Sequence, residues 1–410
     1  MSARPFAGRR VLLGVTGGIA SYKAAWVARL LAQAGAEVDV VMTRSAQEFV
    51  GAVTIEALTG RRVHTDLIAP GHALDHIKLA RAAELVVVAP ATADFLARAV
   101  GGHADDLLAA CLLATSAPVL LVPAMNDRMW AHPAVARNTA EARALGYHVL
   151  DPADGALAAG EGSGPGRMPE PETIVAHAAR LLEARGALAG RHVVVTAGPT
   201  REAVDPVRYL SNHSSGKMGV ALAAAAWRRG ADVTLVAGPL QVAVPPGVRH
   251  VPVGTTAEMA AAVADALPGA DVLVMAAAPA DFRPAARAEQ KIERGEGALT
   301  LALEPTPNIL ATTRGHRRPG AVVVGFALET TDTDANARRK LAAKDLDLVV
   351  LNDATEAGAG FGVDTNRVTL IAHDGAAEAL ALMPKGEVAD AILDRVDALL
   401  AARASAAPGR

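Results

Sequence analysis

The sequence predicts an α/β protein with two tandem three-layer domains and mainly parallel sheets. Apolar runs of strand length alternate with amphipathic helical stretches along almost the whole chain, a rhythm typical of parallel strands covered by helices on both faces. The pattern restarts near residues 186–190, where Gly190–Gly198 has the same polar lead, buried strand and Thr/Gly turn as Gly8–Gly17. With 410 residues, the chain is long enough for more than one domain. We therefore predict domains at residues 1–187 and 188–402, followed by a disordered tail at 403–410.

The first domain is predicted from short, continuous runs of Val and Leu that are bounded by polar residues or glycine. Such runs are typical of strands that are buried on both faces of a parallel sheet. The predicted strands are Val11–Val15, Val38–Met42, Leu85–Ala89, Val119–Val122 and, more weakly, His148–Leu150. The predicted helices are Ile19–Ala34, Asp75–Ala83, Asp105–Ala114, Met129–Leu145 and Glu172–Ala184.

The second domain repeats this alternation of strands and helices. An alanine-rich helix is expected at Met218–Arg229, directly after a loop that is rich in glycine and serine. The predicted strands are Val193–Thr196, Val233–Ala237, Val272–Ala276, Val322–Gly325, Leu348–Leu351 and Val368–Ile371.

Composition excludes several classes of function. Hydrophobic residues make up 51% of the chain but aromatic residues only 3%, so the cores must consist of Ala, Val and Leu. The net charge of −3 gives no electrostatic case for binding nucleic acid or an anionic membrane. A single cysteine, Cys111, rules out an intramolecular disulfide and argues against a cysteine-based metal site. No signal peptide or apolar run of transmembrane length is apparent, so we expect a cytoplasmic protein.

The loop at residues 208–219 is the strongest local indication of function. It follows a strand-like run and leads into the helix at Met218, so backbone N–H groups and the positive end of the helix dipole converge there, as in phosphate-binding loops. The loop also carries the amide of Asn212, the hydroxyls of Ser214 and Ser215, and the ammonium of Lys217. It is not a Walker A loop, because Lys217 is followed by Met and the upstream glycine is missing.

A second candidate phosphate loop, Thr16–Ala20, follows the first strand and opens a helix. It lacks the G-x-G-x-x-G pattern of dinucleotide sites and therefore favours a mononucleotide. Thr43, Ser45 and Thr92 follow the next strands, at the edge of a parallel sheet where ligands bind. Each hydroxyl taken alone is equally well explained as a helix cap.

Taken together, these motifs resemble the bifunctional bacterial enzymes of coenzyme A synthesis that join phosphopantothenoylcysteine decarboxylase to phosphopantothenate–cysteine ligase. The resemblance covers nearly the whole chain, and it rests on several strings in the right order. In the first domain these strings are Gly14–Lys23, Asp75–Lys78, Ala89–Ala93 and Pro123–Trp130. In the second they are Thr196–Glu202, Asn212–Gly219, Ala276–Pro284 and Val324–Thr330.

For the first half, the resemblance implies a flavodoxin-like flavoprotein domain that decarboxylates 4′-phosphopantothenoylcysteine to 4′-phosphopantetheine with FMN. It implies that His76 is the base and that Asn126 holds the departing carboxylate. His76 also lies near the start of a predicted helix, where the dipole disfavours the imidazolium form and keeps a neutral base available. Met129 and Arg167 are expected to bind substrate together with Asn126. The residues expected to bind FMN are Gly17, Gly18, Ile19, Thr43, Ser45, Thr92 and Met125.

The loop expected to cover this substrate departs from the family pattern. Ala159 stands where the family has the cysteine that protonates the enethiolate, and the loop is about one residue longer than usual. Alanine has no proton to donate. Either Ser163, Glu161 or water replaces the cysteine, or the last, reductive step is impaired. Cys111 is no replacement, because its apolar neighbours indicate a core position.

For the second half, the resemblance implies a Rossmann-like domain that ligates cysteine to 4′-phosphopantothenate through an acyl-cytidylate made from CTP. Asn212 is expected to hold the acyl group, Lys217 to bind substrate, and Lys291 to neutralise charge on the transferring phosphate. Mg²⁺ is expected with the triphosphate, but no carboxylate cluster in the sequence identifies its ligands. Two departures are milder: Glu293-Arg294 replaces a lysine pair, and Asn308 replaces an aspartate. The residues expected to bind CTP are Ala276, Asp281, Lys291, Phe326, Lys340 and Lys344.

Two other interpretations remain open from the sequence. The first is an active ligase fused to a flavin domain with impaired or altered decarboxylase chemistry. The second is a non-catalytic flavodoxin-like regulatory subunit, which the presence of His76 and Asn126 disfavours. The resemblance also implies homo-oligomerisation, with flavin domains in trimers and ligase domains in dimers, which together make a dodecamer.

Overall fold

In the computed structural model, the chain divides into two compact units at residues 183/184, four residues before the predicted domain boundary. Unit 1 comprises residues 1–183 and unit 2 residues 184–410, and each is described by itself. The structure describes residues 5–68, 70–294, 298–329, 333–353, 360 and 362–406.

Unit 1 is built on a parallel sheet with the strand order β3-β2-β1-β4-β5-β6. The chain starts in the middle of the sheet, so the order reverses beside β1, and the carboxyl ends of β1, β2 and β4 meet at one edge. Apart from the two-residue edge strand β3, this is the order of flavodoxin-like sheets. The strands are β1 (Arg10–Val15), β2 (Glu37–Met42), β3 (Val63–His64), β4 (Leu85–Ala91), β5 (Val119–Pro123) and β6 (His148–Val149), and a separate hairpin consists of β7 (Ala153–Ala156) and β8 (Ser163–Arg167).

Helices cover both faces of this sheet because its strands are apolar on both sides. In β1, Val11, Leu13 and Val15 belong to one core cluster and Leu12 belongs to the cluster on the other face. The first cluster includes side chains of α1, α2 and α8, and the second includes side chains of α3, α4, α5 and α7. The helices are α1 (Ser21–Gln33), α2 (Ala52–Thr59), α3 (Asp75–Ala82), α4 (Ala93–Gly101), α5 (Leu107–Ala114), α6 (Asp127–Trp130), α7 (Pro133–Ala144) and α8 (Pro171–Glu183), with a short 3₁₀ helix η1 (Arg44–Glu48).

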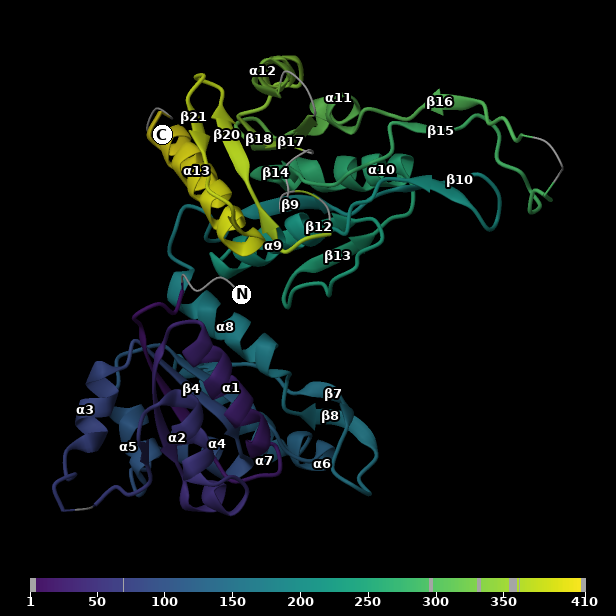
Figure 1. Cartoon of the computed structure of the whole chain (residues 1–410). Helices are drawn as coiled ribbons and strands as arrows, with labels where there is room; N and C mark the ends of the chain where they lie inside the picture. Colours follow the sequence, from purple (N-terminus) through teal and green to yellow (C-terminus); the bar gives the residue numbers. More distant parts are fainter. Residues whose placement is uncertain are drawn as a thin grey trace. The chain divides into compact units, whose positions relative to one another are not determined.

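Unit 2 has a mixed sheet with the strand order β13-β12-β9-β14-β17-β18-β20-β21. The strands from β13 to β18 are parallel, and β20 and β21 add an antiparallel edge. Helices α10, α11 and α12 supply one core, while α9 and α13 contact each other and strands of the sheet (Figure 1). The strands are β9 (His192–Ala197), β12 (Asp232–Ala237), β13 (Arg249–Pro252), β14 (Val272–Met275), β17 (Val322–Glu329), β18 (Leu348–Asp353), β20 (Val368–Ala372) and β21 (Ala377–Ala379), with a small pair β19 (Thr365–Asn366) and β22 (Met383–Pro384). The helices are α9 (Lys217–Arg228), α10 (Thr256–Ala266), α11 (Ile309–Thr312), α12 (Thr333–Ala343) and α13 (Lys385–Ala406), with 3₁₀ helices η2 (Leu267–Gly269) and η3 (Arg314–His316).

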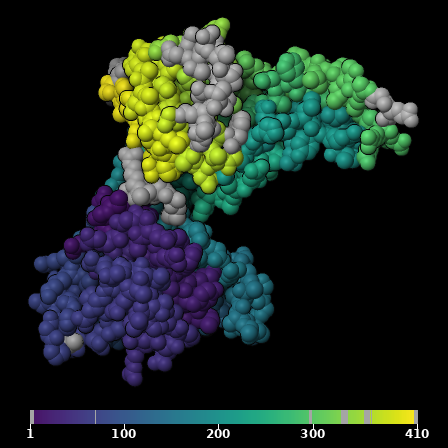
Figure 2. All heavy atoms as spheres, viewed as in Figure 1, coloured from purple at the N-terminus to yellow at the C-terminus, as the bar shows by residue number. Residues whose placement is uncertain are grey.

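An arm projects from the parallel sheet of unit 2 and is built from two distant segments. One segment holds the antiparallel pair β10 (Arg201–Ala203) and β11 (Tyr209–Ser211), and the other holds β15 (Phe282–Pro284) and β16 (Leu303–Pro305). Strands β10 and β15 are in contact, and Figure 2 shows the arm as one projection made of teal and green chain. We call these residues, 201–211, 282–294 and 298–305, the arm.

Two sequence predictions need correction. The predicted helix Met129–Leu145 is two helices, α6 and α7, because Pro133 begins a new helix that the imidazole of His132 caps at the Ala134 N–H (3.2 Å). Residues 403–406, which were assigned to a disordered tail, belong to α13. Arg403 explains this order, because it donates to the Gly320 carbonyl (2.8 Å) and pairs with Asp347. Residues 407–410 lie outside the described residues.

Candidate active sites

The glycine loop of unit 1 lies where β1 passes into α1 and is held by side-chain hydroxyls. The Ser21 hydroxyl lies 2.8 Å from the Thr16 carbonyl and 2.6 Å from the Gly18 carbonyl. The Thr16 hydroxyl donates to the Pro90 carbonyl (2.8 Å) and accepts from the Thr92 N–H (3.1 Å). These bonds tie the end of β1 to the end of β4, so the loop has a fixed shape before any ligand enters.

Gly17 and Ser45 approach so closely that only glycine fits at position 17. A Cβ at this position would lie 2.4 Å from the Ser45 Cβ. The Thr43 hydroxyl accepts from the Ala46 N–H (3.3 Å) and the Thr92 hydroxyl accepts from the Phe95 N–H (3.2 Å), so both residues are helix caps. Both residues also line a hollow together with Ser45. Each can therefore cap a helix and still face a ligand at this edge of the sheet.

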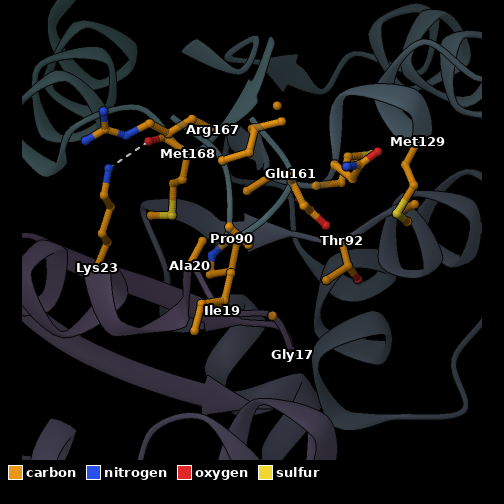
Figure 3. A pocket seen from close by; sticks show the side chains of 18 of the residues that line it. Gly17, Ile19, Ala20, Lys23, Pro90, Thr92, Met129, Glu161, Arg167 and Met168 are labelled. Carbon is orange, nitrogen blue, oxygen red and sulfur yellow. Dashed lines mark hydrogen bonds between the residues drawn. The ribbon is translucent and has the colours of Figure 1, made fainter. Parts of the chain in front are cut away.

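A cavity of about 490 Å³ adjoins the glycine loop (Figure 3). Its wall combines the end of β1, the end of β4, the loop after β5 and the β7–β8 hairpin, which are far apart in sequence. The predicted site residues that line it are Gly17, Gly18, Ile19, Thr92, Met125, Asn126, Met129 and Arg167.

The hairpin is attached to the loop that carries Asn126. The Met125 N–H donates to the Gly166 carbonyl of β8 (3.0 Å), and the Asn126 side-chain oxygen accepts from the Arg128 N–H (2.9 Å) at the start of α6. Asn126 is therefore held by its own helix cap at the cavity wall. On the other side of the cavity, the Lys23 ammonium donates to the Met168 carbonyl (2.9 Å, Figure 3).

The hairpin turn brings Glu161 to the cavity in the region of the missing cysteine. Of the described turn residues, Leu157, Ala158 and Glu161 line the cavity, whereas Ala159 and Ser163 do not. The turn is closed by the Leu157 N–H, which donates to the Gly162 carbonyl (2.9 Å). Among the side chains that the sequence offered as substitutes, the geometry favours Glu161 over Ser163.

His76 does not lie with these residues. It is on α3 and borders a separate open hollow with Ile77, Leu113 and other apolar residues. Its Nδ1 is buried and has no hydrogen-bond partner among the residues that the structure describes. Its backbone carbonyl accepts from the Cys111 thiol (3.6 Å), and burial raises the pKa of that thiol to about 12, as expected for a core cysteine.

The second site is a cavity of about 420 Å³ in unit 2, at the carboxyl ends of β14 and β17 and the start of α9. Asn212 lies at its wall, where the side-chain amide donates to the carbonyls of Ala278 (3.1 Å) and Pro279 (3.0 Å). The predicted site residues that line it are Asn212, Lys217, Ala276, Asp281, Phe326, Lys340 and Lys344.

Positive charge is concentrated in this cavity. Lys217, Lys340, Lys344 and Lys385 line it, and Asp281 is the acidic residue in the described lining. Burial and the neighbouring Lys340 ammonium lower the pKa of Lys344. Such a cavity favours a polyanionic ligand, which would offset the repulsion among the ammonium groups.

Lys291 is the exception among the predicted ligase residues. It is exposed on the arm and is absent from the described lining of the cavity. The adjoining Ile292 N–H donates to the buried carboxylate of Asp205 (3.2 Å), and the Ala288 N–H donates to the Val204 carbonyl (3.0 Å). The segment that carries Lys291 is therefore fixed to the β10–β11 side of the arm.

We expect the arm to loosen at acid pH through Asp205. Burial by itself raises the pKa of this carboxyl, but hydrogen bonds from the Arg208 guanidinium and from the N–H groups of Val207, Arg208 and Ile292 lower it well below its usual range. A carboxyl whose pKa is lowered by folding stabilises the fold above its unfolded pKa of about 3.9, and this contribution is lost as the pH falls further. The protection factors of amides in residues 205–211 and 288–292, which compare each exchange rate with the intrinsic rate at the same pH, should therefore be constant from pH 7 to about 4.5 and should fall below about pH 4. In Asp205→Asn the same amides should have low protection factors at every pH, and an equally protected variant would contradict the assignment.

Two family models cover nearly the whole chain. Residues 2–183 match the Flavoprotein model, and residues 188–400 match the model of the DNA/pantothenate metabolism flavoprotein C-terminal domain. The coenzyme A biosynthesis bifunctional protein CoaBC of Bacillus subtilis (strain 168) is 45% identical over 396 residues, which is 95% of this chain and 97% of the relative. The CoaBC protein of Mycobacterium tuberculosis (strain ATCC 25618 / H37Rv) is 48% identical over 408 residues, which is 96% of this chain and 97% of the relative. The chain belongs to the CoaBC family.

Membership of the CoaBC family confirms the resemblance found in the sequence. The protein is a bifunctional enzyme of coenzyme A biosynthesis, with a flavoprotein decarboxylase half in unit 1 and a ligase half in unit 2. A crystal structure of the C-terminal domain of a CoaBC protein is 37% identical, covers 52% of this chain and 98% of that chain, and has a TM-score of 0.44.

Several lining residues escaped the comparison of motifs with the CoaBC family. Asn352, Asn366 and Lys385 line the ligase cavity but belong to no matched string, whereas Tyr22 and Lys23, which line the decarboxylase cavity, lie in a matched string but were given no role. Asn352, Asn366 and Lys385 all follow Thr330, where the last matched string ends. Of these residues, only Lys385 could have been singled out in the sequence. It is a cation directly after Pro384 at a helix start, where anionic residues are preferred.

The part of the chain that the structure describes holds no cluster of three or more His, Cys, Asp or Glu residues arranged to bind a metal ion. Within the same residues, no helix has both the length and the apolar character needed to cross a bilayer.

Proposed function

We propose that the ligase half joins cysteine to 4′-phosphopantothenate with CTP, and that the flavoprotein half then decarboxylates 4′-phosphopantothenoylcysteine to 4′-phosphopantetheine with FMN. One observation carries the proposal: each unit has a cavity at the carboxyl ends of its parallel strands, lined mostly by residues from the matched strings. FMN-dependent cysteine decarboxylation appears in the description of a solved protein, SpaF, that is 36% identical over 39% of this chain.

The residues of the decarboxylase cavity fit FMN. The glycine loop leaves no room for a Cβ beside Ser45, and it leads directly into α1, where helix N–H groups favour a phosphate. Gly17, Gly18, Ile19, Thr43, Ser45, Thr92 and Met125 would hold the cofactor. FMN, when bound, supplies the electron sink that an unactivated carboxylate needs to leave as CO₂.

The chain's own groups have three roles in this half. The Asn126 amide holds the substrate carboxylate, with Met129 and Arg167 lining the rest of the substrate position. The imidazole of His76 accepts a proton from the substrate. Glu161 delivers the last proton to the enethiol product of decarboxylation, in the role that the family gives to cysteine.

In the ligase half, Asp281, Lys340 and Lys344 bind CTP, Lys217 binds substrate, and Asn212 holds the acyl group. Lys340 lies on α12, and Lys344 directly follows its last residue, Ala343, with its N–H donating to the Lys340 carbonyl (3.0 Å). The two lysines are therefore one turn apart and both line the cavity. Mg²⁺ would accompany the triphosphate and offset part of its charge.

The positions of His76 and Lys291 support homo-oligomerisation. Within the described chain each lies outside the cavity where its chemistry is needed. We infer that a neighbouring copy supplies His76 across the apolar hollow around α3 and α5, and that another supplies Lys291 through the arm. Trimers of flavin domains and dimers of ligase domains then combine into a dodecamer.

Anaerobic mass spectrometry of the products from 4′-phosphopantothenoylcysteine tests the decarboxylase proposal. A product lighter by CO₂ alone is expected, because Glu161 closes the cycle in the absence of a cysteine at position 159. Glu161→Gln should instead accumulate a product that is two hydrogens lighter still. If the unsubstituted enzyme already accumulates that product, the half is an impaired decarboxylase; a colourless enzyme without turnover would overturn the assignment. Pyrophosphate release from CTP that requires both cysteine and 4′-phosphopantothenate tests the ligase half separately.

A further inference from the structure

Two lysines occupy the first positions of helices that line the ligase cavity. Lys217 begins α9 and Lys385 begins α13. The start of a helix carries partial positive charge, so an ammonium group there is unfavourable for the helix itself. Lys217 belongs to a matched string, but Lys385 has no role in the proposed chemistry.

Both lysines bind the same short segment of chain. The Lys385 ammonium donates to the carbonyls of Gly360 (3.0 Å) and Val363, and its backbone N–H donates to the Asp364 carbonyl (2.9 Å). The Lys217 ammonium donates to the Gly362 carbonyl (2.8 Å) and to the Asp364 carboxylate (2.7 Å). The Asp364 backbone is therefore held in place next to Lys385. The Asp364 carboxylate in turn holds the Lys217 ammonium.

Burial of the Lys385 ammonium in this position costs free energy. Lys385 is only 7% exposed, and its acceptors among the described residues are backbone carbonyls, while the Asp364 carboxylate contacts Lys217. Burial and the Lys217 ammonium lower the pKa of Lys385, against the attraction of Asp364. A buried cation with this cost is better explained by a ligand-binding role than by helix stability.

We propose that Lys385 is a positioning residue for the polyphosphate of the nucleotide: its ammonium fixes the backbone at Gly360 and Val363, directly before Asp364, whose carboxylate aims the Lys217 ammonium into the cavity. Lys385 thus acts through Lys217. The inference rests on the proposed CTP-dependent ligase reaction. It assigns a function to a residue from outside every matched string.

The test is a double-mutant cycle on the full-length protein, with CTP and Mg²⁺ as the probe. Lys385→Met should raise both the calorimetric Kd and the KM for CTP about tenfold, with kcat and the KM for 4′-phosphopantothenate changed less than about threefold. Lys217→Met should weaken CTP binding at least as much as Lys385→Met does. If Lys385 acts through Lys217, the double variant should bind CTP no more weakly than Lys217→Met alone.

Arg395→Met is the matched control. It removes a cation from the same helix, but Arg395 is exposed and pairs with Glu378 away from the cavity (Nε–Oε2, 3.0 Å). CTP binding should be unchanged in this variant. Lys385→Arg, which keeps the charge, should recover part of the affinity that Lys385→Met loses.

Three results would overturn the proposal. They are an unchanged Kd for CTP in Lys385→Met, additive effects on CTP binding in the double variant, and a loss of kcat alone in Lys385→Met. The last result is the one that a merely structural role would give. If Lys385→Met does not fold, Asp364→Asn replaces it, because that carboxylate is 90% exposed and its removal leaves the Lys385 contacts in place. Asp364→Asn should weaken CTP about threefold, and wild-type affinity in this variant would equally overturn the proposal. If the unsubstituted protein itself does not bind CTP, the proposed ligase function fails instead.

Discussion

Replacing Gly238 with alanine is expected to lower ligation at least about 10²-fold and to destabilise the ligase half while decarboxylation continues. Gly238 follows β12, and its N–H donates to the Ala197 carbonyl at the end of β9 (3.0 Å). A Cβ at position 238 would lie 1.7 Å from the Pro199 carbonyl oxygen and 2.8 Å from the carbonyl carbon, so backbone rather than a flexible side chain must move. Overpacking against backbone costs about 3 kcal/mol or more of unfolding free energy.

The displaced turn also supports the catalytic amide. Pro199 forms a bridge with Ala278, whose carbonyl accepts from Asn212. We therefore expect CTP-dependent ligation to fall by at least about 10²-fold and the thermal transition of the ligase half to move several degrees lower. The decarboxylase half has its own cores and should retain its activity. Gly315→Ala is the matched control, since a Cβ there meets no atom within 4 Å; a Gly238→Ala enzyme as stable and active as this control would contradict the argument.

Mixing two inactive decarboxylase variants is expected to restore activity. His76→Asn removes the base and Asn126→Ala removes the carboxylate ligand, and each variant alone should retain less than about 1% of CO₂ release. If the site is completed by a second copy, mixed oligomers contain interfaces with an intact Asn126 on one side and an intact His76 on the other. Random reassembly of equal amounts makes such interfaces about a quarter of the total, so about a quarter of the activity should return.

The control for this experiment is a mixture of the unsubstituted enzyme with the double variant His76→Asn/Asn126→Ala. The activity of this mixture per site should fall after reassembly, because unsubstituted copies then lie next to copies of the double variant. Complementation requires subunit exchange, which mass spectrometry of the mixed oligomers verifies. No recovery in verified mixed oligomers would show that His76 and Asn126 act within one chain, and the open hollow around α3 and α5 would then need another explanation.

Much of the fold was predictable because buried parallel strands have a strong local signature. The runs at Val11–Val15, Val38–Met42 and Leu85–Ala89 all appear as strands, extended by one or two residues. Helix ends were less predictable. Pro133 divides the helix predicted from Met129, and Arg403 keeps the last turns of α13 in place through contacts made far away in sequence.

The arm was not predicted, because its strands are only three residues long and its two β pairs come from segments that are far apart in the sequence. The association of these segments involves Asp205, a single carboxylate that accepts hydrogen bonds from N–H groups of both. Short strands with such partners leave no periodic pattern in the sequence.

The sequence by itself determined the family, the two α/β halves and the identity of most cavity residues, because phosphate loops and strand ends depend on local order along the chain. Only the tertiary structure decided which of those residues share a cavity. His76 and Lys291 lie outside the cavities in which they were expected. Glu161 lines the decarboxylase cavity whereas Ser163 does not, and Lys385, from a segment with no motif, lines the ligase cavity. The physical reason is that a cavity is formed by elements that meet through packing of the sheet and its helices. Sequence spacing within one element says little about which distant element will lie opposite.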